Sequence, residues 1–150
     1  MARAIALSIE NVTSGKGGPF GCVVVRNGKI IAEGVNQVTI TNDPTAHAEI
    51  VAIREACHQL GAFQLDDCDI YSSCEPCPMC LGAIYWARPS KLYFASTAED
   101  AARAGFDDRF IYEQLEVDYR NRTIPAVQLM REEAKEAFRL WEKSPQKIDY

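Results

Sequence analysis

Two short segments, far apart in the chain, limit most strongly what this sequence can fold into. The first contains His47 and Glu49, and the second contains Cys77 and Cys80. Imidazole and thiolate groups are preferred zinc ligands, usually in a tetrahedral arrangement. The fold must therefore bring both segments to one point, and the sequence predicts a zinc site made by His47, Cys77 and Cys80.

Local signals place both segments at the starts of helices. Cys77 and Cys80 have the i, i+3 spacing that puts two side chains on one face of a helix, here one starting near Pro78. The dipole and the free N–H groups at a helix start favour thiolates. Residues 43–45 are typical of a helix start, and Thr45 is the predicted N-cap.

Three protein ligands leave the fourth zinc position to water, which distinguishes a catalytic site from a structural one. Zinc lowers the pKa of that water to about 7, and Glu49 is predicted to take its proton and pass it to the reacting group. The alternative is a zinc-stabilised binding module with Cys74 as fourth ligand. That alternative gives Glu49 no task, and His58 points elsewhere because it lies further along the same helix.

Length and composition indicate one globular domain over residues 1–150. The net charge of −5 and the sequence pI of about 5.1 argue against a nucleic-acid partner. No apolar run approaches the roughly 20 residues of a membrane span, so no membrane partner is expected. Two of the six cysteines are assigned to metal, and the predicted location is a reducing cytoplasm.

Hydrophobic periodicity and turn residues predict alternating helices and strands. The expected helices span residues 3–13, 46–60, 78–86, 98–104, 111–115 and 132–143. The expected strands span residues 20–26, 29–35, 68–72, 91–95 and 126–130. Asn27-Gly28 predicts a two-residue hairpin. We therefore expect an α/β fold, a three-layer α/β/α sandwich with a mixed five-stranded sheet.

Several further segments have two interpretations. The glycine-rich residues 14–19 suggest a phosphate cradle, but a strand follows them, so close approach of backbone to a ligand is favoured. The amide of Asn36 suits the edge of a nucleobase or a turn. Tyr85 and Trp86 indicate core or a subunit interface rather than substrate stacking. Residues 106–110 form either a solvated turn or a lid.

Taken together, these motifs resemble the bacterial guanine deaminases of the cytidine deaminase-like fold. His-x-Glu followed by Pro-Cys-x-x-Cys is the signature of zinc deaminases in general. Gly105-Phe106-Asp107-Asp108 and the terminal Tyr150 favour the guanine branch. The resemblance spans most of the chain and is weakest over residues 116–147. Its other motifs are Gly17-Gly18-Pro19-Phe20-Gly21, Glu33-Gly34-Val35-Asn36, Asn42-Asp43-Pro44-Thr45, Leu65-Asp66-Asp67-Cys68 and the run from Ser73 to Pro89.

The resemblance implies zinc-dependent hydrolysis of guanine to xanthine and ammonia, with one zinc ion per subunit. It implies proton transfer by Glu49 and a second acidic group, Asp108, facing the base or the departing ammonia. The implied substrate contacts are Asn36, Phe20, the backbone at Ala48 and a closing Tyr150. A homodimer is implied as well, in which the C-terminal segment, about residues 100–150, is exchanged between subunits.

Two rival activities share the metal motif. A guanosine deaminase needs room for ribose where Tyr150 and residues 106–110 are expected to close the pocket. A deaminase of transfer-RNA adenosine needs a basic face, and the lysines and arginines of this chain are scattered among a larger number of acids. Both rivals are less favoured than guanine.

Overall fold

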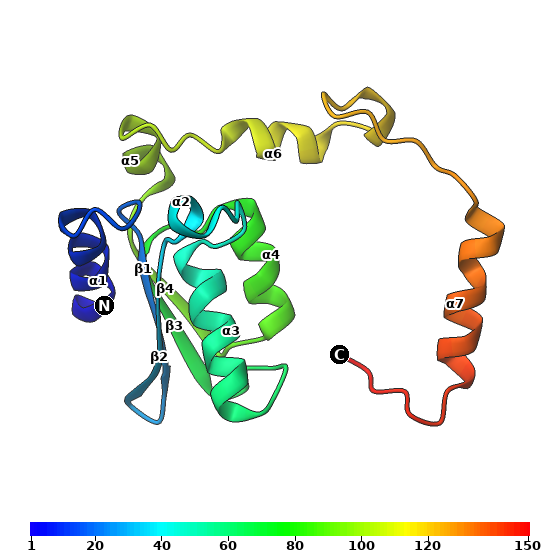
Figure 1. Cartoon of the computed structure of the whole chain (residues 1–150), viewed down its shortest axis with the longest axis horizontal. Helices are drawn as coiled ribbons and strands as arrows, with labels where there is room; N and C mark the ends of the chain where they lie inside the picture. The colour runs from blue at the N-terminus through cyan, green and yellow to red at the C-terminus, as the bar shows by residue number, and fades with distance from the viewer. The chain divides into compact units, whose positions relative to one another are not determined.

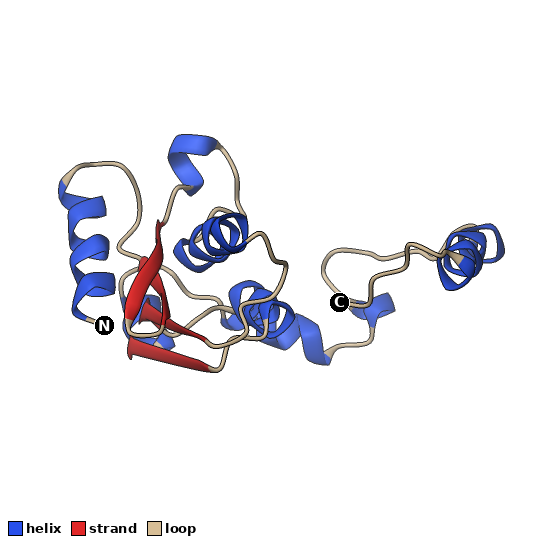
Figure 2. Ribbon diagram, turned by 90° about the horizontal axis from the view of Figure 1, so that it is seen from below, coloured by secondary structure: helices blue, strands red, loops and turns tan.

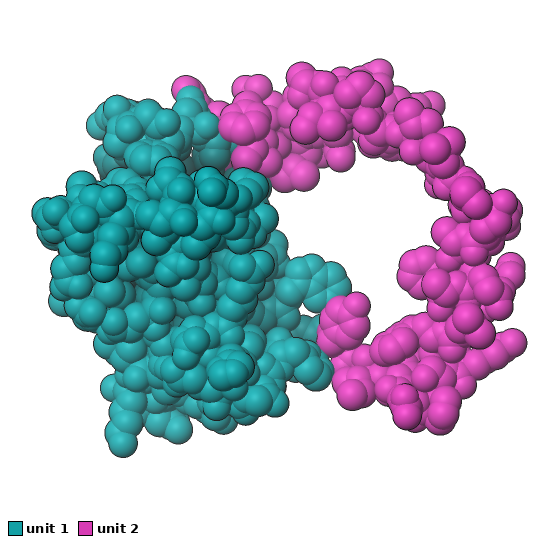
Figure 3. Space-filling model, viewed as in Figure 1, with its two compact units in different colours: residues 1–108 teal, residues 109–150 magenta.

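The computed structural model describes all residues 1–150, which form two compact units (Figure 3). The first unit, residues 1–108, contains the sheet and most helices, and the second comprises residues 109–150. The elements of the first unit are α1 (Ala2–Thr13), β1 (Gly21–Arg26), β2 (Lys29–Val35), α2 (Val38–Thr41), α3 (Ala48–Leu60), β3 (Cys68–Cys74), α4 (Pro78–Ala87), β4 (Lys91–Ser96) and α5 (Ala98–Arg103). The second unit holds α6 (Arg109–Glu116), a 3-10 turn (Tyr119–Asn121) and α7 (Arg131–Lys143).

The sheet is mixed, as expected, with strand order β2-β1-β3-β4 (Figure 1). Strand β1 pairs antiparallel with β2 and β3, whereas β3 and β4 are parallel and are connected through α4. Asn27 and Gly28 both have positive φ, 51° and 74°, which a tight hairpin turn of this kind requires.

The prediction of a fifth strand over residues 126–130 is wrong. These residues form no strand, and the sheet has four. A strand needs a neighbouring backbone to complete its hydrogen bonds, and the second unit contains no strand at all. Alternation of apolar residues there reflects an irregular segment whose Val127 and Leu129 are exposed.

Apolar side chains pack on both faces of the sheet. On one face, Cys22, Val24 and Ile70 pack with α3 and α4. On the other, Val23 packs with Ala4 and Leu7 of α1. Figure 2 shows α1 apart from α3 and α4 across the strands. The alternation of Cys22, Val23 and Val24 between the faces follows from the two-residue period of a strand.

Two glycines let helices approach the sheet closely. A Cβ atom at Gly21 would lie 2.8 Å from Leu7 Cβ of α1, and one at Gly34 would lie 2.6 Å from the Ala52 nitrogen of α3. Helix α1 therefore turns its buried side, Ala4, Leu7, Ser8 and Asn11, to the sheet. The apolar stripe of Ile5, Ile9 and Val12 on the same helix is exposed.

The other departures concern helix ends and the outer side of α4. The predicted N-cap Thr45 is wrong, because α3 begins at Ala48 with His47 as its N-cap; Asp43 instead accepts from both the N–H and the hydroxyl of Thr45. The core interpretation of Tyr85 and Trp86 is also wrong, since they are 75% and 64% exposed. Helix α4 thus carries apolar side chains on its exposed side as well as on its buried side. None of the helices has both the length and the apolar character to span a membrane.

Candidate metal and catalytic site

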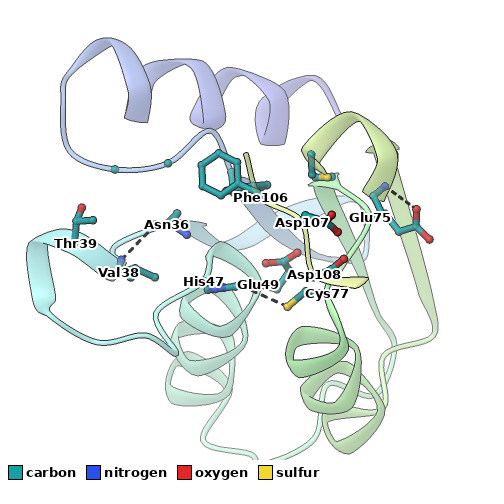
Figure 4. Close-up of a pocket in the computed structure, with 16 residues that line it drawn as sticks. Asn36, Val38, Thr39, His47, Glu49, Glu75, Cys77, Phe106, Asp107 and Asp108 are labelled. Carbon is teal, nitrogen blue, oxygen red and sulfur yellow. Dashed lines mark hydrogen bonds between the residues drawn. The ribbon is translucent and has the colours of Figure 1, made fainter. Parts of the chain in front are cut away.

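A cavity of about 430 Å³ opens in residues 1–108, where β2 and β3 end and where α3 and α4 begin (Figure 4). Concave sites with a few convergent polar groups are typical of small-molecule binding. The polar lining contains imidazole, carboxylate, thiol and amide groups. The lining residues are Gly17, Gly18, Phe20, Asn36, Val38, Thr39, His47, Glu49, Cys74, Glu75, Cys77, Ala98, Ala101, Phe106, Asp107 and Asp108.

A cluster of potential metal ligands lies at this cavity. The Nδ1 atom of His47 lies 3.6 Å from Sγ of Cys77 and 3.5 Å from Sγ of Cys80. All three ligand atoms lie within 4.8 Å of one another. Zinc bonds of about 2.1 Å to nitrogen and 2.3 Å to sulfur allow one ion to reach all three, so the donor set fits zinc in type and spacing.

Both ligand segments are positioned by helix starts. His47 is the N-cap of α3, Cys77 is the N-cap of α4, and Cys80 lies in the first turn of α4 behind Pro78. Neither N-cap side chain bonds its own helix, so the imidazole and the thiol are free to face the cluster. The partial positive charge at a helix start stabilises a thiolate placed there.

The two thiols differ in acidity because they contact each other. A hydrogen bond from Cys80 lowers the pKa of Cys77 to about 4, and the same contact raises the pKa of Cys80. Contact with Cys77 raises the pKa of His47. Since the thiolate is the metal-binding form of cysteine, Cys77 is held ready as a ligand at neutral pH.

Glu49 lies beside the cluster in the first turn of α3 and is 5% exposed. Its Oε1 accepts a hydrogen bond of 3.0 Å from the Ser72 hydroxyl, and its Oε2 lies 3.4 Å from the Cys80 sulfur. Burial raises the pKa of the Glu49 carboxyl group. A carboxylate with a raised pKa next to a metal-ligand cluster is better suited to take up a proton than an exposed one is.

The remaining cysteine and histidine do not complete a four-ligand structural site. Cys74 is buried, but its sulfur points to the Thr97 carbonyl at 3.6 Å and does not belong to the ligand cluster. Burial raises the pKa of the Cys74 thiol to about 11. His58 is exposed near the other end of α3. The cluster therefore has three protein ligands, as a catalytic site requires.

Asn36 directly follows β2 and is 7% exposed at the cavity wall. Its Oδ1 accepts a 3.3 Å hydrogen bond from the N–H of Val38, drawn as a dashed line in Figure 4. A backbone N–H can only donate, so the atom facing Val38 must be the amide oxygen. The Nδ2 group of Asn36 is consequently left to donate to a ligand.

Two phenylalanines form an aromatic wall of the cavity. Phe20 and Phe106 meet edge to face, with ring centroids 4.9 Å apart and an interplanar angle of 87°. Gly18 lies against them, and a Cβ atom there would approach the Phe20 ring to 3.4 Å. At Gly17 a Cβ atom would collide with the Asn36 carbonyl group. The glycines therefore allow close packing of the backbone on Asn36.

Acidic side chains gather at the same cavity. Asp108 lines it, and burial raises the pKa of its carboxyl group. Glu75 also lines it, with Oε2 accepting a 2.9 Å hydrogen bond from the N–H of Ala98 (Figure 4). The sequence interpretation missed Glu75 and Thr39. The available signal for Glu75 was its position next to the Pro76-Cys77 ligand segment.

Two expected site residues differ from the others in their placement. Ala48 is fully buried at the start of α3, next to His47, and does not line the cavity. Tyr150 belongs to the second unit, so its predicted closing role stays a prediction. The structure thus brings together Phe20, Asn36, His47, Glu49, Cys77 and Asp108 at one cavity, with Cys80 behind Cys77.

Comparison with known proteins agrees with this arrangement. Residues 1–96 match the family described as the cytidine and deoxycytidylate deaminase zinc-binding region. The chain is 55% identical to a guanine deaminase of Bacillus subtilis over 150 residues, all of this chain and 96% of that protein. An X-ray structure of guanine deaminase from Bacillus subtilis superposes with a TM-score of 0.97 at 56% identity, covering 99% of this chain and 95% of that one.

More distant relatives match a smaller part of the chain. A guanine deaminase structure from Nitrosomonas europaea has a TM-score of 0.68 and 32% identity, covering 71% of this chain and 62% of that one. A tRNA-specific adenosine deaminase of Aquifex aeolicus is 42% identical over 78 residues, or 52% of either chain. These two relatives therefore match only part of this chain, unlike the guanine deaminase of Bacillus subtilis.

Proposed function

The chain belongs to the family that carries the cytidine and deoxycytidylate deaminase zinc-binding region, and from this we propose that it hydrolyses guanine to xanthine and ammonia. The observation that carries the proposal is the extent of similarity. The Bacillus subtilis guanine deaminase matches over all 150 residues, whereas the tRNA-specific enzyme of Aquifex aeolicus matches over 78. The match to the tRNA-specific enzyme leaves about half of the chain uncovered.

We assign His47, Cys77 and Cys80 as the protein ligands of one zinc ion per chain, supported by their spacing. When bound, zinc supplies a Lewis acid that lowers the pKa of a coordinated water to about 7. The helix starts of α3 and α4 position the imidazole and the thiols that would hold the ion.

Glu49 is assigned the proton transfers of the reaction. Its Oε1 accepts from the Ser72 hydroxyl and its Oε2 faces the Cys80 sulfur of the ligand cluster, so the carboxylate is held next to the position of the attacking water. The carboxylate takes one proton from the water and passes it to the ring nitrogen, and it then moves the second water proton to the amino group that leaves from C2. Water thus supplies the second oxygen of xanthine, the proton that stays on the ring nitrogen and one proton of ammonia, whose other two hydrogens come from the amino group of guanine; the carboxylate ends in its starting form. The buried position of Glu49 supports this cycle, because burial raises the pKa of its carboxyl group and so favours uptake of the water proton.

Recognition of the base is assigned to groups on opposite sides of the cavity. Guanine offers acceptors at N7 and O6, which suit the Nδ2 donor of Asn36. Asp108 accepts from purine N–H groups, and Phe20 packs on the ring. A site with such buried polar groups rejects bases that leave them unpaired. The backbone at Ala48 and the ring of Tyr150 are assigned the remaining contact and the closure.

The proposed assembly is a homodimer in which the C-terminal segment is exchanged between subunits. The exchanged segment is assigned to about residues 100–150, and the division of the chain into two compact units after Asp108, within this range, supports it. Exposed Tyr85 and Trp86 on α4 offer apolar surface for a subunit contact.

Apolar clusters on both sheet faces support the three-layer α/β/α arrangement. Free thiols at the ligand positions suit a reducing cytoplasm.

Ammonia release from zinc-loaded protein tests the proposal. Guanine, guanosine, cytosine, cytidine and adenine are supplied in parallel, with a transfer-RNA anticodon stem-loop that carries adenosine at the wobble position as a sixth substrate. The expected result is release from guanine with kcat/KM at least about 100-fold above that for each other substrate. Preference for guanosine would show that the pocket leaves room for ribose, and release from transfer RNA alone would overturn the purine-base assignment.

A further inference from the structure

The side chain of Asn11 is a buried polar group for which the chemistry above gives no role. It lies near the end of α1 and is 3% exposed, on the helix side that also buries Ala4, Leu7 and Ser8. Burying an amide costs free energy unless its groups are hydrogen-bonded. The buried amide of Asn11 therefore indicates specific hydrogen-bond partners.

Both partners of the Asn11 amide nitrogen are backbone carbonyls of segments that line the cavity. Nδ2 donates one hydrogen bond of 2.9 Å to the Gly18 carbonyl and another of 2.9 Å to the Asn36 carbonyl. Gly18 and Asn36 both line the cavity. The two hydrogens of a single amide nitrogen thus join the glycine-rich segment to the residue that follows β2.

One further hydrogen bond joins the same two segments, from the Asn36 N–H to the Phe20 carbonyl at 3.2 Å. Within the glycine-rich segment, the Phe20 N–H donates to the Gly18 carbonyl at 2.8 Å. Asn11 holds the Asn36 carbonyl group, and Val38 holds the Asn36 side-chain oxygen. Hydrogen bonds therefore hold Asn36 at its backbone nitrogen, its backbone carbonyl and its side-chain oxygen. Of these three bonds, the one from Asn11 is made by a side chain of another element.

We propose that Asn11 is a positioning residue for purine recognition, which fixes the Asn36 donor and the Phe20 wall in one arrangement. The inference rests on the proposed function, since it concerns how the same cavity binds its base. Asn11 does not touch the substrate. It acts by holding two carbonyl groups whose segments carry the groups that do.

Loss of the Asn11 donor leaves the buried Asn36 carbonyl and the half-buried Gly18 carbonyl without that partner and loosens both segments before the base binds. The cost falls on binding rather than on chemistry, because Glu49 and the metal ligands lie on other elements. KM for guanine is expected to rise about tenfold or more, with kcat within about threefold of wild type. A rise in KM at constant kcat identifies lost binding of this kind.

Two substitutions separate a hydrogen-bonding role from space filling. Asn11→Ala removes the amide, whereas Asn11→Asp keeps its size and replaces the donor by an oxygen that faces two carbonyl oxygens. If Asn11 positions the site, both variants raise KM, and Asn11→Asp raises it at least as much as Asn11→Ala. If Asn11 only fills space, Asn11→Asp keeps the wild-type KM, and the proposal is overturned.

Ser8→Ala is the matched control on the same helix. Ser8 is buried too, but its hydroxyl donates to the Ile5 carbonyl of its own helix at 2.8 Å. It is expected to change stability without raising KM for guanine. An equal rise in KM for Ser8→Ala would assign the effect to α1 as a whole and would contradict a specific role for Asn11.

Backbone hydrogen exchange tests, without any substrate, whether Asn11 holds the segments of Gly18 and Asn36 together. In Asn11→Ala the amides of Phe20, Asn36 and Val38 should exchange at least about tenfold faster than in wild type, and in Ser8→Ala they should not. Unchanged exchange overturns the inference even if guanine proves not to be the substrate. If the wild-type protein is inactive on guanine and Asn11→Ala still shows faster exchange, only the proposed function is contradicted, because Asn11 then holds the two segments as inferred.

Discussion

The two units of the molecule differ in what they bury. Every buried residue belongs to residues 1–108, including the fully buried Leu65 and Ile70 and the ligand Cys80. In residues 109–150 no residue is buried, and Phe138 and Leu140 of α7 are 70% and 63% exposed. A segment of about 40 residues rarely buries enough surface to be stable alone. The metal-ligand cluster therefore lies in the unit that has its own core.

The largest expected effect concerns the carboxylate of the first unit. Glu49→Gln removes the proton acceptor and keeps the shape, so turnover should fall by about 1,000-fold while zinc content and thermal stability stay near wild type. Glu55→Gln, at an exposed position on the same helix, is the control and should keep full activity. Near wild-type turnover by Glu49→Gln would contradict the assigned proton transfer.

A second prediction compares the stability of the two units directly. Ile70 is fully buried, so Ile70→Ala should lower the free energy of unfolding by about 2–5 kcal/mol. Phe138→Ala, at a 70% exposed position, should change it by less than about 0.5 kcal/mol. Urea unfolding monitored by circular dichroism measures both. Equal losses would show that α7 is buried in the assembled protein.

Removal of residues 144–150 tests the function of the second unit. Loss of this tail, including Tyr150, should lower turnover on guanine about tenfold or more and change the melting temperature by less than about 2 °C. The physical reason is that the tail buries no residue but carries the assigned closing ring. Tyr150→Phe is the milder variant. A sharply lower melting temperature with unchanged kcat would assign the tail to packing instead.

The smallest expected effect is a pH dependence at the surface of the first unit. A hydrogen bond from Arg3 lowers the pKa of Glu33. Its contribution to stability is therefore present above the unfolded pKa of about 4.3 and is lost as the pH falls through the lower folded value. Glu33→Gln should lower the melting temperature slightly at pH 7 and not at pH 3. An equal difference at both pH values would exclude this ion pair as its cause.

The metal ligands could be predicted from sequence because their residue types stand in the His-x-Glu and Pro-Cys-x-x-Cys patterns of zinc deaminases. The helix start at His47 rather than Thr45 was not predicted, because it depends on the backbone around the ligand. The hairpin was predictable from the consecutive residues Asn27 and Gly28, and the α/β class from the alternation of helix and strand patterns along the chain.

Other features depend on contacts that a local pattern does not contain. The apolar spacing over residues 3–13 predicted helix α1 but not which of its sides faces the sheet, because that depends on the close approach at Gly21. The false strand over residues 126–130 arose because its pattern cannot reveal the absence of a pairing neighbour. Asn11 gave no signal, because its role depends on two distant carbonyl groups.

Zinc content and guanine turnover, measured on one preparation of the full chain, test whether three protein ligands hold a catalytic zinc. We expect about one zinc ion per chain, loss of ammonia release when a chelator removes the metal, and recovery when zinc is restored. His47→Ala should lose both zinc and activity, while His58→Ala should keep both. Full guanine turnover by protein that contains far less than one zinc per chain would contradict a zinc-dependent reaction.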